Sequence, residues 1–123
     1  MEESILQSIR KMIGGVAVEE GQEGPFDLDL IIHINSVLQV LNQLGIGKED
    51  FQITGDEEVW FQFLGRKFKN LNMVKTYVYL RVRMLFDPPS SGTLLQAMKE
   101  NAAELEWRLN TKVDRGYSEK GGN

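Results

Sequence analysis

The fold class of this 123-residue chain depends on one stretch, Leu71-Asn-Met-Val-Lys-Thr-Tyr-Val-Tyr-Leu-Arg-Val-Arg-Met-Leu-Phe86. Apolar residues alternate with polar ones in its second half, as in a half-buried strand, and its valines and tyrosines favour β structure. However, no partner strand or hairpin turn is evident elsewhere in the chain. The stretch also has an apolar helical side, made of Leu71, Val74, Val78 and Leu85. We therefore predict a helix, which Asn70 can cap and which Pro88 and Pro89 end because proline has no amide hydrogen to donate.

On either side of this stretch, apolar residues recur at helical spacing in four more segments. These are a short helix between Glu2 and Gly14, a long one from Asp27 to Leu44, a short one from Asp56 to Gly65, and a last one from Leu94 to Leu109. Asp27 or Asp29, Asp56 and the Ser90-Ser91 pair are the candidate N-caps, with Glu57 and Glu58 in the first turn after Asp56.

The sequence thus predicts an all-α fold, a small helical bundle of about five helices. Val16 to Pro25 is acidic and rich in glycine, which predicts a long acidic loop. Residues 110–123 mix charges with glycines and predict an extended C-terminal tail without a core of its own. We expect one helical domain over residues 1–109 and a tail over residues 110–123, since this length supports a single core.

Composition excludes several classes of site. The chain is 41% hydrophobic and 26% charged, as in ordinary globular proteins, and it contains no cysteine, so disulfides, thiolate metal sites and a catalytic thiol are excluded. The sequence contains no run of about 18 apolar residues, so it predicts neither a membrane span nor a signal peptide. The net charge of −4 argues against general binding to a phosphate backbone.

The charges are unevenly placed along the chain. The positive residues between positions 66 and 83 have no acidic neighbour, and they are Arg66, Lys67, Lys69, Lys75, Arg81 and Arg83. The acidic residues form two clusters, Glu19, Glu20 and Glu23, and Asp56, Glu57 and Glu58. This asymmetry predicts either solvated helix sides or complementary contact surfaces.

No group of residues predicts catalysis, a metal site or a cofactor. The single His33 lacks a second ligand at metal spacing and is better explained as a core or interface residue. Trp60 and Trp107 lie beside apolar neighbours, so core burial is favoured over an interface for both. We therefore expect a protein that is not an enzyme.

Three runs together resemble the head–tail connector (adaptor) family of siphovirus-type tailed phages, over roughly residues 1–112. They are Asp29-Leu-Ile-Ile-His-Ile-Asn-Ser36, then Val74-Lys-Thr-Tyr-Val-Tyr-Leu80 leading to Leu85-Phe-Asp-Pro-Pro89, and Ala103-Glu-Leu-Glu-Trp-Arg-Leu-Asn110. The resemblance implies an all-helical virion protein that forms a ring, typically of twelve copies, between the portal protein and the next neck or head-closure protein. It also implies a location at the head–tail junction, after a stage in the host cytoplasm, with genomic DNA passing through the ring without sequence-specific binding.

A ring closed by heterologous contacts joins one face of each subunit to a different face of the next. We therefore expect the basic side to meet an acidic cluster of the neighbouring subunit, and carboxylates in the channel to repel DNA phosphates. We expect the tail, through Lys112, Arg115, Tyr117 and Lys120, to dock on the portal or a neck protein.

Two alternatives stay open from the sequence. One is a DNA-packaging protein of the small-terminase type, which would need a basic recognition helix, although the basic segment here doubles as a core helix. The other is a stand-alone helical regulator.

Overall fold

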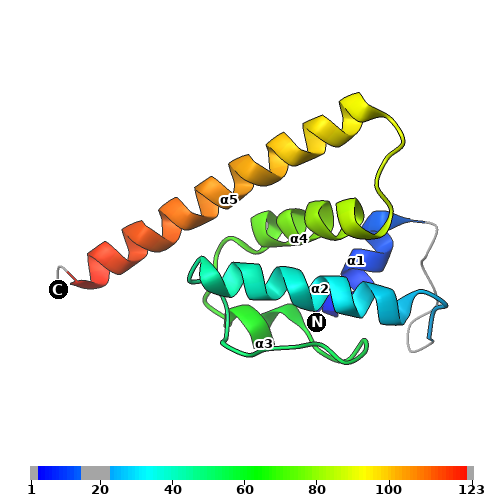
Figure 1. Cartoon of the computed structure of the whole chain (residues 1–123). Coiled ribbons are helices and arrows are strands. Elements are labelled where there is room, and N and C mark those ends of the chain that lie inside the picture. Colours follow the sequence, from blue (N-terminus) through cyan, green and yellow to red (C-terminus); the bar gives the residue numbers. More distant parts are fainter. Residues whose placement is uncertain (1–2, 15–22, 122–123) are drawn as a thin grey trace.

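The computed structural model describes residues 3–14 and 23–121, with side chains as far as Thr111. Within these residues it is a bundle of helices without a β-strand (Figure 1). The helices are α1 (Ile5–Ile13), α2 (Asp27–Gln43), α3 (Trp60–Leu64), α4 (Leu71–Phe86) and α5 (Gly92–Gly121). The prediction of an all-α bundle of about five helices is confirmed.

Helix α4 lies at the centre of the bundle and packs against α1, α2 and α5. Its Val74, Tyr77, Val78 and Val82 are fully buried, at the three- and four-residue spacing of a helix. Because neighbours cover α4 on several sides, it needs apolar residues on more than one side. That requirement explains why its sequence also resembles a strand, and its bounds are the predicted ones.

The core is built from the apolar sides of all five helices and two residues of the connection between α2 and α3. Its fully or almost fully buried members include Ile5, Leu6, Ile9, Leu30, Ile34, Val37, Leu38, Leu41, Ile46, Ile53, Trp60, Phe63, Val74, Tyr77, Val78, Met98, Ala102 and Leu109. Helices α2 and α4 run antiparallel, so the first turns of α2 lie beside the last turn of α4 (Figure 1).

The capping predictions are correct at Ser91, whose Oγ accepts a hydrogen bond from the Leu94 amide at 3.2 Å. They are wrong for Asp27 and Asp29, because α2 begins at Asp27 itself and has no side-chain cap. The prediction for Asp56 is also wrong, since α3 starts only at Trp60 and all three acidic residues precede it. In each case the carboxylate has another partner or remains exposed.

Helix α5 is longer than its apolar repeat predicts. The repeat ends at Leu109, but the helix continues to Gly121, through the segment expected to be an extended tail. Once a helix has formed, each added residue gains one backbone hydrogen bond, so polar residues can prolong it beyond its core contacts. Figure 1 shows the last part of α5 projecting beyond the ends of α2 and α4. The division of the chain at residue 109 into a helical domain and a tail stays a prediction.

Candidate functional site

A buried ion pair joins α1 to the start of α2. Arg10 is 1% exposed, and its Nε donates to Asp27 Oδ1 at 3.0 Å while its Nη2 donates to Oδ2. The Gly24 amide also donates to Asp27, at 2.9 Å. Arg10 Nη1 is buried and has no hydrogen-bond partner in the described part of the chain. Sequence reasoning missed this pair.

An acidic hollow of about 440 Å³ opens beside the ion pair. Glu23 lines it from the segment before α2, and Asp56 lines it from the connection before α3. Asp56 also accepts a hydrogen bond from Gln7 Nε2 at 3.3 Å. The structure therefore brings one residue of each predicted acidic cluster to the same place, while Glu19 and Glu20 lie outside the described residues. We call this site, defined by Glu23, Asp27 and Asp56, the acidic hollow.

The other two residues of the second cluster have different surroundings. Glu57 is exposed, whereas the Glu58 carboxylate accepts hydrogen bonds from the Thr54 amide at 3.0 Å, the Thr54 hydroxyl at 2.8 Å and the Gly55 amide at 3.3 Å. Partial burial raises the pKa of Glu58, but the combined hydrogen bonds outweigh it and hold that pKa below its usual value of 4.5. Ionised Glu58 thus holds the turn at one wall of the acidic hollow.

This lowered pKa predicts a pH-dependent stability. A carboxyl with a lower pKa in the folded state stabilises the protein above its unfolded pKa of 4.5. That contribution is lost as the pH falls through the folded pKa. We expect Glu58→Gln to be less stable than the wild type at pH 7 in urea unfolding, and the difference to shrink below pH 4.5. A difference that does not change between pH 7 and pH 3 would contradict this.

Three of the predicted basic residues gather in the loop between α3 and α4. Lys67 and Lys69 are exposed, and neither takes part in the ion pairs found among the described residues. The guanidinium carbon of Arg66 lies 3.9 Å from the centre of the Phe61 ring. We call Arg66, Lys67 and Lys69 the basic loop.

The other three basic residues lie on α4 and have partners within the same chain. Lys75 pairs with Glu3, and Arg83 Nη1 donates to the Tyr79 hydroxyl at 3.0 Å. Arg81 Nη1 lies 3.7 Å from Oε2 of Glu106 on α5. The six positive residues therefore do not form one continuous side.

Glu106 also binds the hydroxyl of Tyr77, which donates to it at 2.7 Å. Burial and this hydrogen bond raise the pKa of Tyr77. The hydroxyl therefore remains a donor and ties α5 to the central helix.

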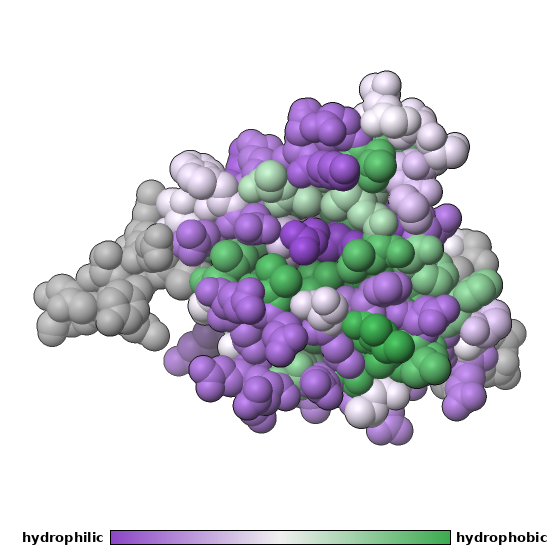
Figure 2. Space-filling model, viewed as in Figure 1, coloured by the Kyte–Doolittle hydropathy of each residue, from purple (hydrophilic) through white to green (hydrophobic). Residues whose placement is uncertain are grey.

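Two large apolar side chains are exposed in the first half of α2. Leu28 is 71% exposed and Ile32, one turn later, is 56% exposed. Figure 2 shows hydrophobic residues gathered over this part of α2. Residues 30–47 contain no Asp, Glu, Lys or Arg, and depletion of charge is typical of interface cores. Leu28 and Ile32 could have been found from the sequence, since they fall outside the core stripe of their helix.

The two tryptophans differ in how far they are buried. Trp60 is 2% exposed and its Nε1 donates to Ser8 Oγ at 2.8 Å, which confirms core burial. Trp107 is 67% exposed on α5, so the prediction of core burial is wrong for it. It lies on the side of α5 that faces away from α4.

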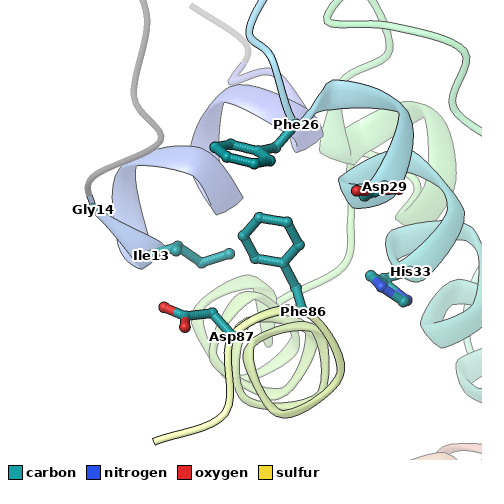
Figure 3. A pocket seen from close by; sticks show the side chains of 7 residues that line it. All are labelled: Ile13, Gly14, Phe26, Asp29, His33, Phe86 and Asp87. Atoms are coloured by element: carbon teal, nitrogen blue, oxygen red, sulfur yellow. The ribbon is translucent and has the colours of Figure 1, made fainter.

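A second hollow, of about 690 Å³, lies where α1 and α4 end and α2 begins. The rings of Phe26 and Phe86 meet edge to face, with centres 5.5 Å apart, and Ile13 points toward them (Figure 3). Asp29, His33 and Asp87 form the polar rim. We call this site the aromatic hollow. His33 is half-buried here, as a rim residue and not a core residue.

The side chains of Lys112, Arg115, Tyr117 and Lys120 lie outside the described residues, so their predicted docking role stays a prediction. Among the residues described, no group of acidic and histidine side chains could hold a metal ion. No helix in the same residues combines the length and hydrophobicity needed to cross a bilayer.

Comparison with known proteins gives one match. Residues 5–116 match the phage connector protein family, and no curated protein or solved structure matches the chain. The match covers α1 to α4 and most of α5, as far as residue 116, and agrees with the all-α fold. The chain therefore belongs to the phage connector protein family.

Proposed function

We propose that this protein is a head–tail connector that forms an oligomeric ring beneath the portal protein and binds the next neck protein on its other side. The observation that carries the proposal is the family match over residues 5–116, nearly the whole chain. On this proposal the protein acts in the virion, at the head–tail junction, and its activity is binding without catalytic turnover.

The placement of charge supports a ring with head-to-tail contacts. The basic loop directly precedes α4, whereas the acidic hollow includes the start of α2, which lies beside the other end of α4. The 16 residues of α4 separate these ends by about 24 Å. A subunit with opposite charges at its two ends can repeat one contact around a closed ring.

A ring of this kind also suits passage of DNA. With a net charge of −4 per chain, a ring carries an excess of carboxylates, which repel phosphates and leave the duplex free to slide. We propose that DNA passes without sequence-specific binding and that twelve copies form the ring.

Charge reversal in the basic loop tests the subunit contact. Lys67→Glu with Lys69→Glu should reduce ring formation about tenfold, since like charges would then face the acidic hollow of the next subunit. Lys75 and Arg81 are less suitable for charge reversal because they already pair with Glu3 and Glu106 of their own chain. Mass photometry of the protein, alone and with the portal protein of the same phage, measures the ring.

Two further variants make this experiment specific. Lys99→Glu reverses an exposed charge on α5 and should leave the ring intact. Adding Glu23→Lys to the double variant should restore part of the ring population. Unchanged rings with Lys67→Glu and Lys69→Glu would show that the basic loop is not a subunit contact.

A further inference from the structure

A groove of about 300 Å³ lies on the side of α2 that faces away from the core. Its apolar residues are Ile32, which is 56% exposed, and Phe51 of the connection between α2 and α3. Ser36 and Gln39, at the next turns of α2, add an exposed hydroxyl and an exposed amide. We call this site the α2 groove. It offers an apolar part beside hydrogen-bonding groups.

The wall of the α2 groove opposite the helix is held in place by Asn35. Its side-chain oxygen accepts from the Ile53 amide at 2.8 Å, and its side-chain nitrogen donates to the Ile53 carbonyl at 3.0 Å. This two-point contact fixes the connection against α2, so the groove is preformed. Of the described residues that line it, only Asp50 is charged, and Asp50 is exposed. The α2 groove therefore fits an uncharged side chain that is partly apolar and partly polar.

Trp107 is a side chain of this kind. It is 67% exposed on the side of α5 that faces away from α4. Its indole ring combines an apolar body with one N–H donor, which usually finds an acceptor when the ring is buried. Ser36 and Gln39 supply oxygen atoms that can accept. Among the large apolar side chains exposed in the described part of the chain, Trp107 alone has a hydrogen-bond donor.

Trp107 and the α2 groove lie on different sides of one subunit, because α4 lies between α2 and α5 (Figure 1). Trp107 therefore cannot reach the groove of its own chain. The neighbouring Glu106 binds Tyr77 in the first half of α4, so Trp107 lies toward the end of α4 that follows the basic loop. Leu28 lines the acidic hollow and Ile32, one turn later, lines the α2 groove, so these two sites adjoin.

We propose that Trp107 of one subunit docks in the α2 groove of the next copy of this chain in the ring. This inference rests on the proposed function and names the apolar centre of the same head-to-tail contact, in which the basic loop meets the acidic hollow. Tryptophan is enriched among the residues that contribute most to binding, and charged residues are depleted at the centre of interfaces. Trp107 and the uncharged side of α2 have these two properties.

Truncation of the ring tests the contribution of Trp107. Trp107→Ala should reduce the ring population about tenfold at a fixed protein concentration, measured by mass photometry with portal protein. Leu94→Ala is the matched control, since Leu94 is also a large apolar residue exposed on α5, and it should leave the ring intact. Both variants should keep the wild-type midpoint of urea unfolding because both side chains are exposed, which separates loss of contact from loss of fold.

Disulfide trapping locates the contact in a chain that has no native cysteine. Full-length Ala103→Cys, one turn before Trp107, and Gln39→Cys are mixed, assembled with portal protein and oxidised. A disulfide needs Cα atoms within about 7 Å, so it forms only where the two positions meet. We expect about tenfold more mixed dimer than with Ala97→Cys in place of Ala103→Cys, because docking raises the local concentration of the two thiols. Ala97 is likewise exposed, but helical spacing puts it on another side of α5.

The outcomes separate this contact from the proposed function. If wild-type rings form but Trp107→Ala leaves them unchanged, or the mixed dimer does not exceed the Ala97→Cys control, the inference is wrong and the connector function stands. If Trp107→Ala keeps the ring mass but loses binding to portal protein, Trp107 contacts the portal and the inference is again wrong. If the wild-type chain forms no ring with portal protein, the proposed function fails and the inference fails with it.

Discussion

Replacing Arg10 by methionine is expected to lower the free energy of unfolding by about 3 kcal/mol, since removing one partner of a buried ion pair leaves the other uncompensated. Arg10 is 1% exposed and binds both carboxylate oxygens of Asp27. In the variant, Asp27 would keep only the Gly24 amide as a hydrogen-bond donor within the described residues. A loss of this size is a large part of the total stability of a small domain, about 5–15 kcal/mol. Urea unfolding followed by circular dichroism measures it.

Two controls show whether the effect comes from the ion pair. Lys11→Met makes the same substitution at the exposed next position and should change stability by less than about 0.5 kcal/mol. Arg10→Met combined with Asp27→Leu removes both charges, so the double variant should recover most of the loss. If Arg10→Met is no worse than Lys11→Met, the pair does not hold α1 on α2.

The sequence was sufficient for the helices but not for the Arg10–Asp27 pair. Helix α4 was predicted with correct bounds because its signals are local, namely apolar spacing and the two prolines, although Asn70 stands before the helix without the predicted side-chain capping hydrogen bond. Arg10 carries no such signal. Beside Lys11 in an amphipathic helix it looks like a solvent-facing residue, and it is buried because a carboxylate 17 residues away lies over it. Only the packing of α1 on α2 determines that contact.

The candidate contact surfaces show the same limit. The charge clusters were visible in the sequence, but Glu23 and Asp56 belong to separate segments that meet only in the folded chain. Conversely, Lys75 and Arg81 are near the basic loop in sequence, yet each pairs with a residue of a different helix or segment. Distance along the sequence therefore did not predict which acidic residues lie together or which basic residues lie apart in the folded chain.

Trp60 and Trp107 show that the local sequence pattern does not determine burial either. Both have apolar neighbours at helical spacing, but α3 places Trp60 against Ser8 of α1, while α5 contacts the bundle along one side only. Trp107 lies on the other side of α5 and remains exposed. The local pattern predicts a helix with an apolar side, whereas the number of neighbouring helices decides how much of that helix is covered.

Gly47 lies in the connection that follows α2, where the backbone passes close to the Phe63 ring of α3. Its φ is +87°, in the left-handed region that favours glycine, and a Cβ atom there would lie 2.2 Å from the ring of Phe63. That ring is buried and packs against Phe51, with ring centres 5.4 Å apart. The Lys48 amide donates to the Phe63 carbonyl at 2.8 Å, which holds the loop close to α3. The ring therefore has little room to move away.

Gly47→Ala is accordingly expected to lower the free energy of unfolding by about 3 kcal/mol, through backbone strain together with the clash against Phe63. Gly65 provides a matched control, because its φ is also +87° but nothing lies within 4 Å of an added Cβ. Gly65→Ala should therefore cost only the backbone strain, about 1 kcal/mol. Urea unfolding of the two variants measures the difference, which isolates the steric contribution of the Phe63 ring. Equal losses would mean that the ring gives way without cost, and that the close approach of this loop to α3 does not contribute to the stability of the bundle.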